Sequence, residues 1–226
     1  REFTANVSHE LRPPLTTISG YAELLSSGML QKPEDATEFG RKILAESRRL
    51  LTLIEDIIRL SRLDEGVRGE VTPVDLTALI QHCVQKLTPA AQNAQVSISA
   101  SGNDPVLISG DHALLEEMLT NLLENGIKYN HAGGYVRLRA EMADGRAVVT
   151  VADNGVGIAP EDQQRVFERF YRVDKSRSKQ TGGTGLGLSI VKHGAQVHHA
   201  QIAMQSALGE GTTITLTFPA QSSGKK

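Results

Sequence analysis

The sequence has little of several features that would assign it to a specialised class of protein. It contains a single cysteine, Cys83, so it cannot form an intrachain disulfide and fits a reducing compartment. No run approaches the roughly 18 apolar residues of a membrane span, and no signal peptide is visible. The formal net charge is only -2 at pH 7. Without a basic field, we expect this segment to bind neither nucleic acid nor a membrane.

What is present is a globular composition, with 39% hydrophobic residues in a chain of 226, enough for one large domain or two small ones. Cys83 lies in a helical pattern and is interpreted as a small buried apolar group rather than a reactive thiol. The first residue already lies within an amphipathic pattern, with no capping residue before it. We therefore expect the sequence to be a fragment of a longer protein.

Residues 1–65 are predicted to form a helical hairpin. Two helical patterns are separated by SSGMLQKPED, whose glycine, proline and acidic residues suit the start of a second helix. The apolar stripe of the second pattern is broader than two short helices need to cover each other. Because such a hairpin buries little surface alone, we expect a second copy to complete a dimeric four-helix bundle. Residues 66–70 are then a linker.

Residues 71–226 are predicted to form a second, α+β domain. The segment EVTPVDL indicates a short strand that ends at a helix start, with Asp75 as the cap. The turn sequence ADGR between two alternating runs indicates a hairpin. Strands paired in this way, with helices on one face, make a sandwich. Further strands are predicted at residues 95–100, 106–109, 135–140, 147–152, 201–205 and 212–218, with helices at 111–128 and 185–197.

Two glycine-rich segments point to a ligand with a flat ring and phosphates. In DNGVGI, Asp153 at a strand end can accept hydrogen bonds from a ligand amine, while Gly155 and Gly157 allow close approach of the backbone. In TGGTGLGLSIVK, residues 181–192, four glycines lead into a helix start, where backbone amides can bind phosphate. Taken alone, each segment is more often an ordinary turn, so their order and separation carry the argument.

The helix ahead of these segments presents Asn121 and Asn125 on one face, with Lys128 three residues further on. Amide oxygens suit Mg²⁺, which usually bridges substrate phosphates, and Lys128 would add a positive charge. The alternative is an ordinary helix C-terminus, with Lys128 complementing the dipole and Asn130 as cap.

Near the start of the chain, SHELRPPLT places Pro13 and Pro14 inside a helical pattern, four and five residues after His9. Proline in a helix interior costs about 3 kcal/mol and removes a hydrogen-bond donor. A bend of this kind can make the segment around the histidine more mobile; the alternative is a kink that packing alone requires.

Together these segments resemble a known family. SHELRPPLT resembles the H box of sensor histidine kinases, and NLLENGIKY, DNGVGI, FERFYR and GGTGLGLSIVK stand in the order of their N, G1, F and G2 boxes. The resemblance covers essentially the whole chain. It implies a dimerisation and histidine-phosphotransfer hairpin followed by an ATP-binding α/β sandwich of the GHKL type, the fold also found in gyrase, Hsp90 and MutL.

The resemblance also implies roles for individual residues. His9 would accept the γ-phosphoryl group of ATP, Glu10 would take the imidazole proton, and Arg172 would stabilise charge during transfer. The stretch between Ile158 and Thr181 would be a mobile ATP lid, with Phe167 and Phe170 packing within it. Positions expected to bind the nucleotide are Asn121, Asn125, Lys128, Tyr129, Asp153, Gly155, Gly157, Gly183, Gly185, Leu186 and Gly187, with Asn125 as the Mg²⁺ ligand.

The function that follows is ATP-dependent autophosphorylation on His9 and phosphoryl transfer to an aspartate of a response regulator in two-component signal transduction. The expected partners are a second copy of the chain and the regulator. The fragment would be cytoplasmic, and the full-length protein anchored in the cell membrane. The alternatives are a related ATPase that drives a conformational clamp, which would lack the hairpin, and a degenerate scaffold without catalysis.

Three residues depart from the family pattern. Gly126 replaces the usual alanine and is expected to weaken its helix by roughly 1 kcal/mol. Gly194 replaces a larger apolar residue. Pro13 stands where a threonine or asparagine is thought to orient a hydrolytic water, so response-regulator phosphatase activity is predicted to be weak.

Overall fold

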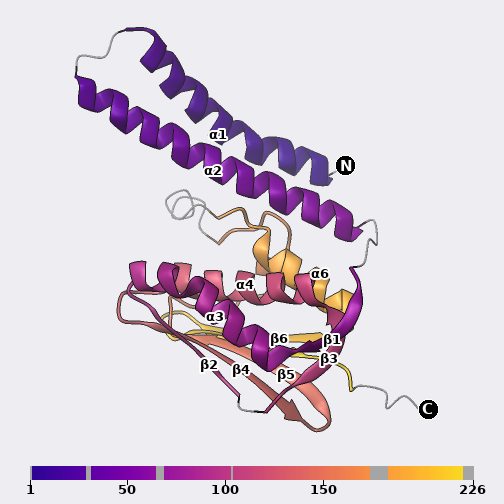
Figure 1. Cartoon of the computed structure of the whole chain (residues 1–226). Helices are drawn as coiled ribbons and strands as arrows, with labels where there is room; N and C mark the ends of the chain where they lie inside the picture. Colours follow the sequence, from indigo (N-terminus) through magenta and orange to yellow (C-terminus); the bar gives the residue numbers. More distant parts are fainter. Residues whose placement is uncertain (1, 29–31, 65–68, 103, 174–182, 221–226) are drawn as a thin grey trace. The chain divides into compact units, whose positions relative to one another are not determined.

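The computed structural model describes residues 2–28, 32–64, 69–102, 104–173 and 183–220 (Figure 1). They divide into two compact units, one formed by the first 65 residues and the other by most of the remaining chain. In these ranges, no helix combines the length and the hydrophobicity that a membrane crossing requires.

The first unit is the predicted hairpin of α1 (Glu2–Ser26) and α2 (Pro33–Asp64). Proline at the first position of α2 presets the helical φ, and the acidic residues after it complement the helix dipole. The rings of Tyr21 and Phe39 pack between the helices, with centroids 5.1 Å apart. Lys42 lies over Tyr21 and pairs with Glu38 at 2.6 Å. The contacts of Tyr21 with Phe39 and Lys42 join the two helices, whereas the pair of Lys42 with Glu38 lies within α2.

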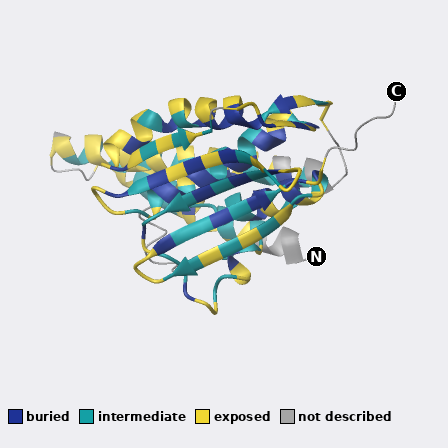
Figure 2. Cartoon of the chain, turned by 90° about the horizontal axis from the view of Figure 1, so that it is seen from below, coloured by how far each residue is buried: buried dark blue, intermediate teal, exposed yellow. Residues whose placement is uncertain are grey.

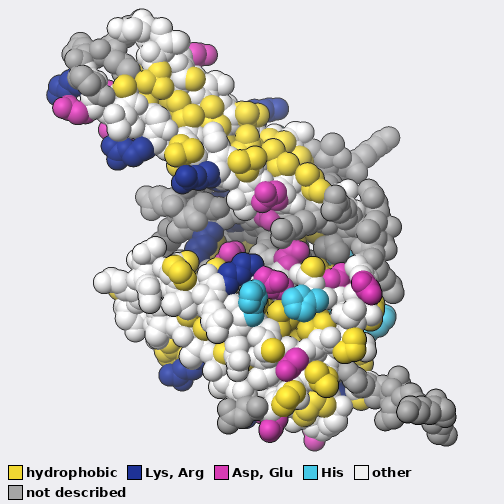
Figure 3. Space-filling model, in the orientation of Figure 1, with side chains coloured by type: hydrophobic (Ala, Val, Ile, Leu, Met, Phe, Trp, Pro, Cys, Tyr) yellow, Lys and Arg dark blue, Asp and Glu magenta, His cyan; other side chains and the backbone are white. Residues whose placement is uncertain are grey.

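Large hydrophobic side chains of the hairpin remain exposed in the single chain, where they form a band along its surface (Figure 3). On α2, Leu44, Leu51 and Ile58 are spaced seven residues apart, the repeat of a helix-packing seam. The predicted excess of apolar surface is therefore confirmed. The exposed residues are Leu15, Leu24, Leu44, Leu51, Ile54 and Ile58.

The second unit begins with the predicted strand and capped helix. β1 (Val71–Asp75) pairs with β3 (Leu107–Asp111) in a two-stranded antiparallel sheet, and α3 (Leu76–Asn93) follows β1 directly. The carboxylate of Asp75 accepts hydrogen bonds from the backbone N–H groups of Thr77 and Ala78 at 2.9 and 3.3 Å. The N-cap prediction is confirmed.

The main sheet has five strands in the order β2-β4-β5-β7-β6. Only β2 and β4 pair in parallel; the other neighbours are antiparallel. The predicted β4–β5 hairpin turns through Asp144 and Gly145, both with positive φ, as a two-residue hairpin turn requires. The strands are β2 (Ser97–Ser101), β4 (Tyr135–Ala143), β5 (Arg146–Asp153), β6 (Gln201–Ala207) and β7 (Gly211–Thr217).

Three helices, α3, α4 (His112–Lys128) and α6 (Gly187–Val197), cover one face of this sheet (Figure 1). Buried and more exposed residues alternate along the strands (Figure 2), so the more exposed residues lie on the face opposite the helices. The predicted α+β sandwich is confirmed. The core between helices and sheet includes Met118, Leu119, Leu123, Val136, Leu138, Val149, Ile190 and Leu216.

Candidate functional site

The site in the second unit is built on the C-terminal half of α4. Asn121 and Asn125 lie one turn apart and are both half-buried. Neither amide side chain has a hydrogen-bond partner in the part of the chain that the structure describes. Lys128 lies in the last turn, with its Nζ 5.2 Å from the ring centroid of Tyr129. Tyr129 itself is 41% exposed. Two amides, a cation and an aromatic ring are therefore presented together.

The same helix end also has the ordinary C-terminal features weighed as an alternative. The side-chain amide of Asn130 donates to the carbonyl oxygens of Gly126 and Tyr135 at 3.1 and 3.0 Å. Lys128 is the basic residue of the last turn. Asn130 thus does satisfy a terminal carbonyl of the helix and ties α4 to the start of β4. This capping leaves the amides of Asn121 and Asn125 unused.

Asp153 ends β5 with its two carboxylate oxygens in different environments. Oδ1 accepts hydrogen bonds from the backbone N–H groups of Gly155 at 2.8 Å and Thr212 at 3.3 Å. Among the described residues, Oδ2 has no partner. Burial raises the pKa of this carboxyl, and the two backbone donors oppose the shift. One oxygen is held in place while the other can accept from a ligand.

The two glycines after Asp153 also make close contacts with the protein backbone that the sequence did not indicate. A Cβ on Gly155 would lie 2.4 Å from the carbonyl oxygen of Tyr129, and one on Gly157 would lie 1.8 Å from that of Ala207. Gly157 also has φ +69°. On these sides the glycines face protein backbone, not free space for a ring. They allow the turn to pack against α4 and β6, which positions Asp153.

The start of α6 meets α4 at Asn121. A Cβ on Gly187 would lie 2.8 Å from Oδ1 of Asn121, so glycine is needed for this approach. Leu186 is fully buried and provides no side-chain cap, so it leaves the first backbone N–H groups of α6 uncapped by side chains. Gly185, with φ +72°, accepts a hydrogen bond from Phe170 at 2.9 Å. The glycines thus place a helix N-terminus beside the amides of α4.

The predicted lid region is described only in part. Residues 174–182 lie outside the described ranges, so its mobility stays a prediction. Before them, a short 3-10 helix, η1 (Arg165–Phe167), contacts α6. Phe167, Phe170 and Arg172 are half-buried, and so is Gly183 after the gap.

The phospho-acceptor segment lies on α1 of the first unit. His9 is exposed, Glu10 is half-buried, and α1 continues through both prolines without interruption. Pro14 is buried whereas Pro13 is exposed. The hydroxyl of Thr17 donates to the carbonyl of Pro13 at 3.1 Å. An accessible imidazole on a helix surface is available for chemistry with an external group.

Sequence reasoning missed the contacts that fix the turn after Asp153. The side-chain oxygen of Asn154 accepts a hydrogen bond from the backbone N–H of Tyr135 at 2.6 Å, and the backbone carbonyl oxygen of Asn154 lies 3.1 Å from Nε2 of His131. These bonds join the start of β4 and the loop after α4 to the turn. The pairs are 19 and 23 residues apart, so no local pattern could have indicated them.

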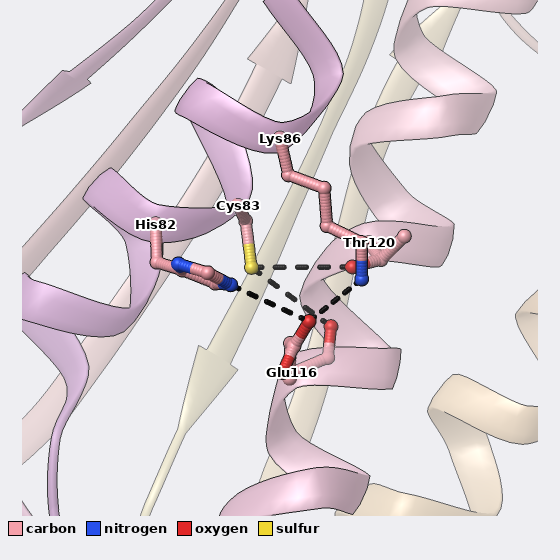
Figure 4. Close-up of polar contacts among 5 residues, drawn as sticks. All are labelled: His82, Cys83, Lys86, Glu116 and Thr120. Carbon is pink, nitrogen blue, oxygen red and sulfur yellow. Dashed lines mark hydrogen bonds and ion pairs between the residues drawn. The ribbon is translucent and has the colours of Figure 1, made fainter.

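Several polar side chains of α3 and α4 lie around the single cysteine, Cys83 (Figure 4). Cys83 is fully buried, and burial raises the pKa of its thiol. Thr120 lies 3.9 Å from its sulfur, and Glu116 pairs with Lys86 at 2.7 Å and with His82 at 3.7 Å. The interpretation of Cys83 as a buried, unreactive residue is supported. Among the described residues, no three or more His, Cys, Asp or Glu side chains are grouped so that they could hold a metal ion.

Comparison with known families gives two matches. Residues 1–66 match the His Kinase A (phospho-acceptor) domain, and residues 110–222 match the histidine kinase-, DNA gyrase B- and HSP90-like ATPase. Among curated proteins, the sensor-like histidine kinase SenX3 of Mycolicibacterium smegmatis is 42% identical over 97% of this chain and 57% of its own length. WalK of Bacillus subtilis is 34% identical over 97% of the chain and 36% of its length. The chain thus spans about half, or less, of these relatives.

Solved structures agree with the fold. The Acinetobacter baumannii histidine kinase AdeS has a TM-score of 0.76 at 24% identity, over 95% of this chain and 98% of its own. Full-length ShkA, solved in complex with AMPPNP, has a TM-score of 0.70 at 30% identity, over 96% of this chain and 45% of its own. With both domains in the expected order, this chain belongs to the family of two-component sensor histidine kinases.

Proposed function

We propose that the chain is an ATP-dependent protein-histidine kinase with a phosphotransfer hairpin at residues 1–65, a linker at 66–70 and an ATP-binding domain at 71–226. The proposal rests on family membership, and the observation that carries it is the asymmetric carboxylate of Asp153. Its Oδ1 is held by two backbone N–H groups while its Oδ2 has no partner among the described residues. Such an oxygen can accept a hydrogen bond from the exocyclic amine of adenine.

The remaining groups fit the rest of ATP. Tyr129 exposes enough ring to pack against the base, and Lys128 supplies a positive charge next to it. The N-terminus of α6 supplies uncapped N–H groups for phosphate oxygens. Gly183, Gly185 and Leu186 shape this end of the site. The AMPPNP complex of ShkA, a relative of similar fold, supports nucleotide binding here.

A magnesium ion fits the donor set. The amides of Asn121 and Asn125 have no hydrogen-bond partner among the described residues, and amide oxygens are hard ligands of the kind that Mg²⁺ prefers. We propose Asn125 as the ligand, with Asn121 beside it. The ion would neutralise charge on the β- and γ-phosphates.

The chemistry at His9 is a phosphoryl transfer. Neutral imidazole attacks the γ-phosphorus through Nε2 while the bond from phosphorus to the β–γ bridging oxygen breaks and ADP leaves. The proton on Nδ1 of the resulting imidazolium passes to Glu10. Arg172 is proposed to stabilise the charge on the transferring group. The phosphoryl group then moves from His9 to an aspartate of the response regulator.

Two partners follow. The heptad-spaced, exposed hydrophobic residues of α2 suit a second copy of the hairpin, giving a four-helix bundle. The histidine kinase ThkA has a structure of the same fold, solved in complex with the response regulator TrrA, which supports a regulator as the second partner. Because this chain matches only 57% of the length of SenX3 and 36% of that of WalK, we also propose a sensor region that anchors the whole protein in the cell membrane.

The test is incubation with Mg·ATP labelled at the γ-phosphate. Wild type is expected to acquire acid-labile, alkali-stable label, and His9→Gln none. His112→Gln, at an exposed histidine of α4, is the matched control and should be labelled like wild type. If wild type binds ATP but stays unlabelled, the chain is a nucleotide-binding scaffold and the kinase proposal is wrong.

A further inference from the structure

His198 is a buried histidine that the kinase chemistry does not use. It follows α6 and is 9% exposed. Its Nε2 lies 3.0 Å from the backbone N–H of Asp111, and its Nδ1 lies 2.7 Å from the carbonyl oxygen of Gly194. The N–H of Asp111 can only donate and the carbonyl can only accept. Nε2 must therefore carry the lone pair and Nδ1 the proton, so the geometry assigns the neutral Nδ1–H tautomer.

The surroundings are shaped to this ring. A Cβ on Gly110 would lie 2.8 Å from Cδ2 and 2.9 Å from Nε2 of His198, so glycine leaves the space that the imidazole fills. Phe218 packs edge-on, with ring centroids 6.3 Å apart. The ring is enclosed by the β3–α4 junction, α6 and the end of β7.

The two hydrogen bonds join the two helices that build the nucleotide site. Asp111 is the N-cap of α4, which carries Asn121 and Asn125. Gly194 belongs to α6, whose first residue lies against Asn121. A Cβ on Gly194 would lie 2.4 Å from Sδ of Met118, so the residue that accepts from the ring also packs directly against α4. His198 therefore joins the start of α4 to the C-terminal half of α6.

We propose that neutral His198 is a positioning residue for nucleotide binding, and that its protonation in mildly acidic conditions separates the end of α6 from the start of α4 and weakens that binding. A proton on Nε2 would face the N–H of Asp111, so an acceptor contact would become a contact between two donors. The inference rests on the proposed ATP site, because α4 and α6 act on ATP only if they bind it.

The charged groups around the ring set the direction of the pH effect. Burial lowers the pKa of His198, and His199 lowers it further, while the hydrogen bond to Gly194 and the carboxylate of Asp111 oppose the shift. Because the pKa of His198 is lowered in the folded state, the side chain is neutral at any pH above the ordinary pKa of histidine. Its contribution is lost as the pH falls through the folded-state pKa.

The experiment measures the Kd of ADP with Mg²⁺ on the whole chain at pH 7.5 and 5.5. The variants are His198→Gln and His198→Asn, with His193→Gln on the same helix as the matched control. ADP titrates identically in all four proteins, so only the difference between proteins reports on His198. Wild type and His193→Gln are expected to lose more affinity between pH 7.5 and 5.5 than the His198 variants, by up to the roughly three- to tenfold that one hydrogen bond is worth.

Two controls make the result decisive. Far-UV circular dichroism at both pH values shows whether each variant is folded, and either His198 variant suffices for the comparison. Histidine ring NMR of the unliganded wild type should show the Nδ1–H tautomer for His198 at pH 7.5, independently of ADP. Parallel pH profiles in wild type and variants, or the Nε2–H tautomer, would overturn the proposal. Failure of wild type to bind ADP at pH 7.5 would instead refute the proposed ATP site and the coupling with it.

Discussion

Gly126 is predicted to be required by its neighbour rather than to be a weak point of α4. A Cβ at this position would lie 2.9 Å from both Cγ1 and Cγ2 of Val136, which is fully buried on β4. Rotation of the valine cannot remove both contacts, because two of the three positions on its Cβ face the glycine and only one of its three substituents is hydrogen. Overpacking of this kind costs about 1–3 kcal/mol, whereas alanine gains about 1 kcal/mol of helix propensity over glycine. Gly126→Ala should therefore lower the free energy of unfolding by about 1 kcal/mol.

A double-mutant cycle with Val136→Ala separates the cost of overpacking from the gain in helix propensity. In that background the added methyl group has space, so Gly126→Ala should raise the free energy of unfolding by about 1 kcal/mol, a coupling of about 2 kcal/mol. Urea unfolding of the whole chain can be followed by tyrosine fluorescence, since there is no tryptophan and three of the four tyrosines lie in the second unit. The reasoning is refuted if Gly126→Ala stabilises the protein that retains Val136.

Three further predictions concern the two units. Asp153→Asn should weaken ADP binding by roughly tenfold or more in calorimetry, because a charge-assisted hydrogen bond is lost. The same substitution should raise the melting temperature of the unliganded chain at pH 7. Burial raises the pKa of this carboxyl, so its ionised form is disfavoured in the folded state. Pro13→Thr should speed the decay of phosphorylated response regulator relative to wild type, and equal, fast decay with both would contradict the prediction. Leu51→Glu on the exposed band of α2 should convert the dimer to a monomer in sedimentation, while Glu38→Gln, away from that band, should leave the dimer intact.

Local signals in the sequence were sufficient for the elements and their order. Asp75 and Asp111 cap α3 and α4 because a side-chain oxygen reaches backbone N–H groups two or three residues away. ADGR turns the β4–β5 hairpin for an equally local reason. The ends of strands were predicted less accurately. β4 runs to Ala143, three residues beyond its predicted end, because its pairing with β5 continues to the turn.

The sequence by itself therefore determined the two units, the family and the candidate residues, since hydrophobic period, caps, turns and spaced motifs act over a few residues. Only the tertiary structure decided why particular residues are needed. Glycine is needed at position 126 because Val136 lies against it, and at position 155 because the carbonyl oxygen of Tyr129 does. His198 is held by Asp111, 87 positions away. Such contacts depend on how helices and strands pack at close range, and the three-dimensional arrangement of the chain alone brings those atoms together.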